Sequence, residues 1–169
     1  PRGTRPVDIS NVPLQLGATY GRDEILAAFG KLWPGGKAYS HQAGPWHHSE
    51  TNSEVLFITL KKSLEHYSPQ TMYRDYAISR ELFHWETPND TRTSSKRGRR
   101  YLEQRGKRLS VFLAIRETRN DSWGVTAPYV LLGPCDYVSH EGERPIGITW
   151  RLRNPIPADL YEQFKLAAA

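Results

Sequence analysis

The clearest pattern along the chain is a series of short apolar segments separated by polar turns. Glu54–Lys62 and Leu109–Glu117 are apolar at odd and even positions alike, which is typical of strands covered on both faces. Pro145–Leu152 alternates between apolar and polar residues, which predicts a strand with one covered face. Tyr129–Leu132 predicts a further strand, and Tyr137–His140 predicts its continuation.

The middle of the chain adds weaker strand signals. Asp75–Ile78 and Leu82–Glu86 are expected either as one interrupted strand or as two short ones. The first 20 residues are rich in Pro and Gly and predict an extended lead-in with enough alternation for a strand. Residues 38–53 are polar and irregular, so we predict a loop there.

Helix signals are short and are bounded by capping residues. Early acids favour a helix that starts after Gly21 and ends at Gly30. Ser94 or Ser95 is expected to cap a second helix that ends at Gly106, and Ala158–Phe164 predicts a third. A glycine inside the second helix, Gly98, is expected to cost it about 1 kcal/mol relative to Ala.

Together these segments predict an α+β domain built on a strongly bent, mostly antiparallel β-sheet or barrel with two or three short helices. The chain of 169 residues suits one domain, and it starts with Pro1, so we expect an excised fragment. We assign residues 1–164 to a single domain and interpret residues 165–169 as a vector-derived tail. No signal peptide or membrane-length apolar run is present, which predicts a cytoplasmic protein with no membrane partner.

Charge is concentrated in one stretch, residues 92–108, here called the basic segment. It holds eight Lys or Arg against one acid, a net charge of +7, whereas the whole chain carries +5. Apolar residues make up 38% of the chain and aromatic residues 11%, and a cluster of aromatic rings directly precedes the basic segment. Cations beside flat rings favour nucleic acid as the ligand.

The candidate contacts combine three kinds of side chain. Lys and Arg neutralise phosphates, aromatic and His rings stack on bases, and Asp or Asn side chains hydrogen-bond base edges. The candidate DNA-binding residues are Tyr73, Asp75, Tyr76, Arg80, His84, Trp85, Asn89, Lys96, Arg97, Arg99, Arg100 and Arg105. Within the predicted strand, Trp85 shares parity with Phe83 and is expected in the core, whereas His84 is expected nearer the binding surface.

Catalytic and metal-binding patterns are weak. The chain has no Gly-rich phosphate loop and no GxSxG motif, and its single cysteine, Cys135, excludes an internal disulfide. Three histidines, His41, His47 and His48, fall in the predicted loop, but no acid lies at a familiar ligand spacing. The combination of Asp75, Glu86 and Lys96 fits no defensible nuclease pattern. We therefore expect no catalytic residue, no metal ion and no cofactor.

Several motifs resemble a known family. They are Tyr73-x-Asp75-Tyr76-Ala77-Ile78, Leu82-Phe83-His84-Trp85-Glu86, Asn89-x-Thr91, Leu131-Leu132-Gly133, Tyr137, Gly142, Pro145-Ile146-x-Ile148-x-Trp150-x-Leu152 and Pro155-Ile156-Pro157. The pattern is similar to an uncharacterised domain at the C-terminus of bacterial superfamily-two helicases that often carry a phospholipase-D-like nuclease module. The resemblance implies DNA processing, such as restriction of foreign or modified DNA. The β-rich outline also resembles barrel domains that read modified bases.

The sequence therefore predicts a non-catalytic DNA-binding module of a restriction or helicase–nuclease protein, with modified DNA as a candidate ligand. Its expected partners are duplex DNA and the other domains of the same full-length protein. The first alternative is a protein-interaction or regulatory domain that docks a helicase core. A small nuclease is the second alternative.

Overall fold

The computed structural model describes residues 3–31, 44–61 and 74–168. One sheet of eight strands dominates the structure, in the order β4-β5-β8-β9-β10-β7-β6, with β3 added beside β9. These strands are β3 (Thr19–Tyr20), β4 (Pro45–His48), β5 (Ser53–Thr59), β6 (Tyr76–Ala77), β7 (Leu82–Glu86), β8 (Ser110–Arg116), β9 (Tyr129–Glu141) and β10 (Gly147–Leu152). A separate pair is formed by β1 (Arg5–Pro6) and β2 (Gln15–Leu16), and the helices are α1 (Arg22–Ala28), α2 (Lys96–Leu102) and α3 (Ala158–Ala168).

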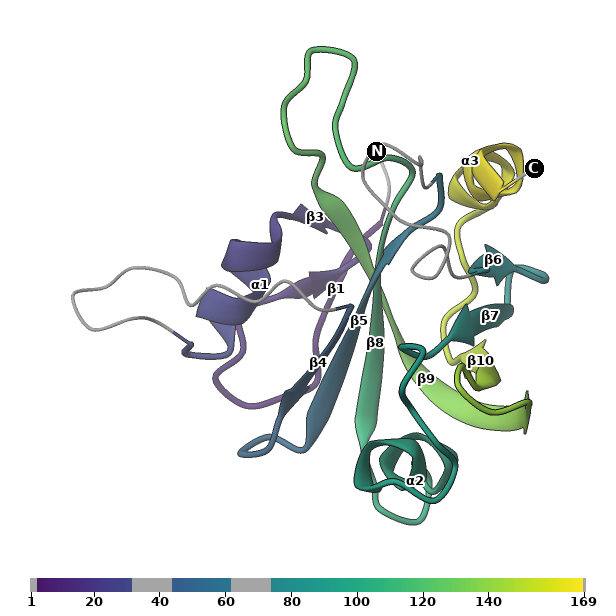
Figure 1. The fold of residues 1–169 in the computed structure, drawn as a ribbon. Helices are drawn as coiled ribbons and strands as arrows, with labels where there is room; N and C mark the ends of the chain where they lie inside the picture. Colours follow the sequence, from purple (N-terminus) through teal and green to yellow (C-terminus); the bar gives the residue numbers. More distant parts are fainter. Residues whose placement is uncertain (1–2, 32–43, 62–73, 169) are drawn as a thin grey trace.

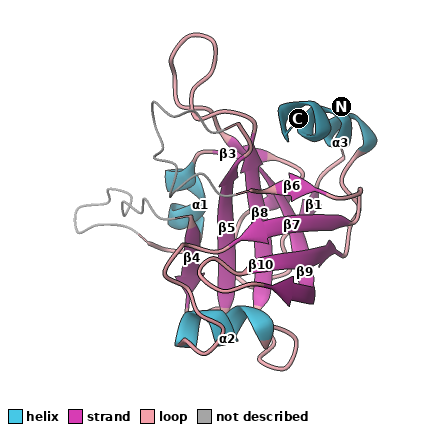
Figure 2. Ribbon diagram, turned by 45° about the vertical axis from the view of Figure 1, so that its right-hand side comes forward, coloured by secondary structure: helices cyan, strands magenta, loops and turns pink. Residues whose placement is uncertain are grey.

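The sheet is mixed and strongly bent. Among the described strands, β5 and β8 pair in parallel and the other pairs are antiparallel. The long strand β9 joins the two halves, because its first part pairs with β8 and its last part pairs with β10. Figure 2 shows β7 and β10 running across the direction of β5 and β8. The α+β class is thus confirmed, but the described strands form an open sheet that ends at β4 and β6.

The main core lies inside this bend. Inner side chains of β5, β8 and the first part of β9 face Phe83 and Trp85 of β7 and Trp150 of β10. Tyr101 of α2 and Phe164 of α3 complete the cluster. The two helices lie at opposite ends of the bent sheet, α2 at the bottom and α3 at the top in both views (Figures 1 and 2). The two helices therefore cover the two ends of the main core and exclude water from them.

A second core covers the other face of the same central strands. Ile25 and Leu26 of α1, with Leu14 and Leu16 from the N-terminal segment, pack there against β5, β8 and β9. Every residue of β5 is consequently buried, as the continuous apolar pattern predicts. No helix in the described ranges has the length and apolar character needed to cross a bilayer.

Three element boundaries differ from the sequence predictions. The prediction of a loop over 38–53 is wrong at residues 45–48, which form β4 and pair with β5. The predicted continuation of Tyr129–Leu132 into Tyr137–His140 is confirmed, because both segments belong to the single strand β9. Helix α2 ends at Leu102, before Gly106, because Glu103 already has a non-helical C-cap conformation. Helix α3 continues past Phe164, and Ala167 is buried, so residues 165–168 extend the helix.

Candidate nucleic-acid interface

Helix α2 begins at a tightly fixed N-terminus. Ser95 is the N-cap residue, and its Oγ accepts a hydrogen bond of 3.0 Å from the Gly98 N–H. The same hydroxyl donates to the carbonyl oxygen of Arg92 at 2.7 Å. Gly98 is buried against that carbonyl, and a Cβ atom at this position would overlap it. The glycine is therefore needed for the close passage of the preceding chain, although it lowers helix propensity.

The inner face of α2 is anchored in the main core. The Tyr101 ring packs edge-to-face on Trp85, with ring centroids 5.2 Å apart. In the turn after the helix, Gln104 Oε1 accepts from the Tyr137 N–H at 2.8 Å, and Gln104 Nε2 donates to the Leu109 carbonyl at 2.9 Å. These contacts fix which face of the basic segment points to solvent.

Most of the basic side chains point to solvent. Lys96, Arg97, Arg99 and Arg105 are exposed. Arg97 lies 3.8 Å from Asp90, a long and exposed ion pair. No acidic side chain of the described chain forms an ion pair with Lys96, Arg99 or Arg105. These three cations are therefore available to neutralise an external anion.

Arg100 has a different role from its neighbours. Its Nε donates to Glu54 Oε1 at 2.7 Å, and the two side chains are 18% and 0% exposed. Burial raises the pKa of the Glu54 carboxyl, whereas the nearby Arg100 guanidinium lowers it. Arg100 therefore neutralises a buried carboxylate. The prediction that Arg100 contacts a phosphate is therefore not supported, because binding a phosphate would leave Glu54 without its partner.

The parity prediction for β7 is confirmed. Trp85 is 3% exposed and lies in the core. Its predicted contact with DNA is therefore wrong, because the ring does not reach the surface. His84 points outward and stacks on Tyr76, with ring centroids 4.8 Å apart and planes tilted by 23°. The His84 side chain is only 12% exposed, whereas Tyr76 is 39% exposed. Tyr76 is thus the ring presented to solvent.

His84 supports that ring from beneath. A Cβ atom at Gly147, on the neighbouring strand β10, would come within 2.9 Å of His84 Cε1. The absence of a side chain at Gly147 therefore makes room for the imidazole. His84 Nε2 also lies 3.9 Å from Glu86 Oε1. The arrangement indicates that His84 positions Tyr76, and that Tyr76 is the better candidate for a direct ring contact.

The remaining predicted residues are dispersed. Asp75 is buried, and its Oδ1 accepts from the Glu86 N–H at 3.0 Å, which fastens the β6 segment to β7. Arg80 lies in the β6–β7 turn near α3, and its Nε donates to the Ile156 carbonyl at 2.7 Å. Asn89 is half-buried between β7 and α2. Tyr73 lies outside the described residues.

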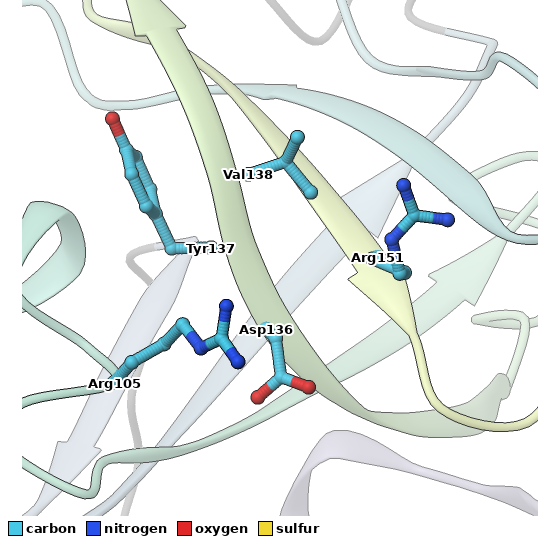
Figure 3. A pocket seen from close by; sticks show the side chains of 5 residues that line it. All are labelled: Arg105, Asp136, Tyr137, Val138 and Arg151. Carbon is cyan, nitrogen blue, oxygen red and sulfur yellow. The ribbon is translucent and has the colours of Figure 1, made fainter.

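A pocket of about 410 Å³ lies where the basic segment meets the outer face of β9 and β10. It is lined by Arg105, Asp136, Tyr137, Val138 and Arg151 (Figure 3). Sequence analysis identified Arg105 but missed the other four. The alternation in Pro145–Leu152 places Arg151 on an outer face. Its pairing with Asp136 across β9 and β10 has no signal in the sequence.

The groups considered for catalysis or metal binding are engaged elsewhere or dispersed. Cys135 is fully buried, and burial raises the pKa of its thiol, which opposes formation of a thiolate nucleophile. His140 Nδ1 lies 2.6 Å from the Tyr137 hydroxyl. The described part of the chain contains no group of three His, Cys, Asp or Glu side chains arranged to hold a metal ion. His41 lies outside the described residues.

These features define an α+β domain with an open, bent sheet and an exposed basic helix at one end. Residues 14–164 match the model of a protein family described as a domain of unknown function (DUF3427), and the chain belongs to that family. No curated protein matches the chain significantly. The C-terminal end of α3, from Lys165 onward, lies beyond the matched region.

Proposed function

We propose that this chain is a non-catalytic DNA-binding module. The observation that carries the proposal is the set of exposed cations on α2 and the following turn, Lys96, Arg97, Arg99 and Arg105. They are held on a helix whose other face is fixed in the core. Because the helix is already ordered, binding a polyanion requires ordering of the side chains alone. Neutralised phosphates release condensed counterions, which supplies affinity without sequence preference.

The outer face of β6 and β7 adds a candidate base contact. Tyr76 offers a ring that His84 already supports, so it loses little freedom when it stacks on a base that leaves the duplex. We propose that this face discriminates between DNA ligands, with modified DNA as the candidate. The resemblance to helicase-associated domains supports a setting in a restriction or helicase–nuclease protein, in which the catalytic steps belong to other domains.

Fluorescence anisotropy with a labelled duplex over a range of salt concentrations tests the proposal. Replacing Lys96, Arg97 and Arg99 together with Ala should weaken binding to all sequences. If each side chain neutralises one phosphate, the slope of log K against log salt should become shallower by about 0.9 for each cation removed. The matched control replaces Arg5, Lys61 and Arg119 with Ala, which removes equal charge from exposed positions outside the basic segment. Equal binding by both triple variants would exclude α2 as the DNA surface.

Discrimination is tested separately with plain and modified duplexes at one salt concentration. Tyr76→Ala should bring the affinities for the two kinds of DNA closer together, and His84→Ala should do so to a smaller degree. Removal of His84 leaves the Tyr76 ring in place but unsupported. An unchanged preference in the Tyr76 variant would limit the module to binding phosphates.

A second candidate function is docking of another domain of the same protein, such as a helicase core. It is favoured by Trp123, which is 88% exposed in the loop between β8 and β9, next to exposed Val125. The loop is internally braced, because Asp121 Oδ1 accepts from the N–H groups of both residues at 2.9 Å. It projects from the end of the sheet opposite α2 (Figure 1). Trp123→Ala should weaken docking without changing DNA affinity, and salt should affect docking far less than DNA binding.

A further inference from the structure

We propose that the pocket between the turn after α2 and the outer face of β9 and β10 is a subsite for one nucleotide. In this assignment a phosphate group binds to Arg105 and Arg151, and the sugar or base lies against Tyr137 and Val138. The proposal rests on the DNA-binding function and names the part of the ligand that this pocket would take.

The charge around the pocket favours an anion. Asp136 is the only carboxylate among the residues that line it, and Arg153 already satisfies this group with two hydrogen bonds of 2.9 and 3.0 Å. These bonds hold the pKa of Asp136 below its usual value, so the carboxylate stays ionised and paired with Arg153. The pair is neutral as a unit, so the two further cations of the pocket, Arg105 and Arg151, give it a net positive charge.

Neither arginine has a strong competing partner. Arg105 forms no ion pair with the described residues, and its guanidinium extends toward Asp136 in Figure 3. Arg151 lies on β10 beyond Val138, and its Nη1 is 3.7 Å from Glu81 Oε2. Both members of that pair are more than half exposed, so the pair contributes little and a phosphate can displace it. A guanidinium is also suited to phosphate, because it donates two parallel hydrogen bonds.

The pocket is of a suitable size and has a less polar wall. Its volume of about 410 Å³ lies within the range of roughly 300–1,000 Å³ that is usual for small-molecule sites. Val138 is an exposed apolar residue at the irregular step of the β9–β10 pairing. The Tyr137 ring is held by the contact of its hydroxyl with His140. This wall can cover a sugar or a base edge while the arginines bind the phosphate.

The position of the pocket links it to the proposed DNA surface. Arg105 belongs to the basic segment, and Gln104, the residue before it, bonds to the backbone of Tyr137. A strand that follows the cations of α2 would therefore reach the pocket directly. The phosphate could be an internal phosphodiester or a terminal phosphate of that strand, since both present the same oxygens to an arginine.

NMR titration of the full 169-residue chain tests the proposal. The probes are a deoxynucleoside 5′-monophosphate, inorganic phosphate and the nucleoside without its phosphate. The first two should cause saturable shifts at the Arg105 and Arg151 Nε–H groups and at the Tyr137 amide, and the monophosphate should bind more tightly. Arg151→Gln should weaken binding of the monophosphate by roughly tenfold or more, the usual effect of losing a charged hydrogen-bond donor. Arg5→Gln removes the same charge from β1 and serves as the control.

Oligonucleotides with and without a terminal phosphate then separate the two sources. A loss in the Arg151→Gln variant that appears only with phosphorylated ends identifies a terminal phosphate, and an equal loss with all oligonucleotides identifies an internal one. Shifts that do not saturate, or that Arg151→Gln leaves unchanged, would overturn the subsite. If duplex binding persists in that case, the proposed DNA-binding function stands without it. Failure of the parent chain to bind any DNA would instead reject the proposed function.

Discussion

His84 and Trp85 are adjacent in sequence, and the strand geometry separates them completely. Trp85 enters the main core, where it meets the Tyr101 ring of α2. His84 lies on the outer face beneath Tyr76. At the scale of single residues, the alternation of a strand is thus sufficient to assign a structural role to one aromatic ring and a surface role to the other.

Replacement of each ring should have unequal effects on stability. Trp85→Ala removes a buried ring and leaves a cavity, so we expect a loss of about 3–5 kcal/mol in unfolding free energy. His84→Ala removes a ring from the outer face of the sheet, outside both cores, and should cost much less. Chemical denaturation of both variants measures the difference. Equal losses would contradict the assignment of the two faces.

Gly98 illustrates a residue whose role is opposite to its local propensity. Helix propensity alone predicts that Gly98→Ala gains about 1 kcal/mol. The overlap of a new Cβ with the Arg92 carbonyl predicts destabilisation instead, by about 1–3 kcal/mol as for other overpacked sites. Gly106→Ala is the control, since its Cβ would lie 3.7 Å from the nearest neighbouring atom, the Glu103 carbonyl oxygen. A rise in melting temperature for Gly98→Ala would show that the preceding chain moves aside.

At the scale of elements, α2 combines a buried and a charged face in seven residues. Neighbouring arginines on this helix should therefore respond differently to mutation. Arg100→Ala leaves the buried Glu54 carboxyl without its ion-pair partner and should cost about 3–5 kcal/mol of stability. Arg99→Ala should leave the unfolding free energy nearly unchanged and weaken DNA binding. Calorimetry and anisotropy on the same two variants check both halves, and comparable stability of the two would refute a structural role for Arg100.

Strand β4 was not predicted, because the residues around it are mostly polar. Trp46 and His48 point to the same side, and the centroid of each ring lies 5.3 Å from that of Phe29, the C-cap residue of α1. Two histidines in a short polar sequence are typical of a loop. Burial of His48 is not evident from the sequence, because Phe29, which packs on it, comes from a distant part of the chain. The pairing of β4 with β5 becomes evident only when those residues are in place.

Burial of His48 also predicts a pH dependence. Burial lowers the pKa of its imidazole, and the Glu50 carboxylate only partly opposes this shift. The folded protein therefore binds fewer protons than the unfolded chain just below pH 6.5. The contribution of His48 to stability is complete above pH 6.5 and is lost as the pH falls through its folded-state pKa. The difference in unfolding free energy between the parent and His48→Gln should shrink on acidification, and a constant difference between about pH 7 and pH 5 would contradict this.

At the scale of the whole molecule, the central strands belong to both cores. Strands β5, β8 and the first part of β9 present one face to the bend and the other to α1. Neither core can therefore lose its packing without exposing strands that the other core needs. The two candidate binding surfaces are also far apart, since the basic helix α2 and the loop that carries Trp123 project from opposite ends of the sheet (Figure 1).

The shared strands predict a single cooperative unfolding transition. Circular dichroism of the backbone and fluorescence of the tryptophans should give the same midpoint in a denaturant titration. Trp46 lies in one core, and Trp85 and Trp150 lie in the other, so fluorescence samples both. Two resolved transitions would show that the cores unfold independently.

The sequence by itself determined the features that depend on local periodicity. The strands of the doubly covered sheet, the opposite faces of His84 and Trp85, a helix cap at Ser94 or Ser95 and the concentration of charge in the basic segment follow from residue spacing and type. Each of these features depends on residues that are close together in the sequence, so local patterns predict them.

Tertiary structure decided which of the candidate residues lie together. Arg99 and Arg100 are alike in sequence, but only Arg100 meets a buried carboxylate, which comes from β5. Arg105 and Arg151 are distant in sequence and line one pocket, because the pairing of β9 with β10 brings Arg151 opposite Asp136. Contacts of this kind depend on the bend of the sheet and on strand register. Both arise from packing of distant segments, which no local pattern encodes.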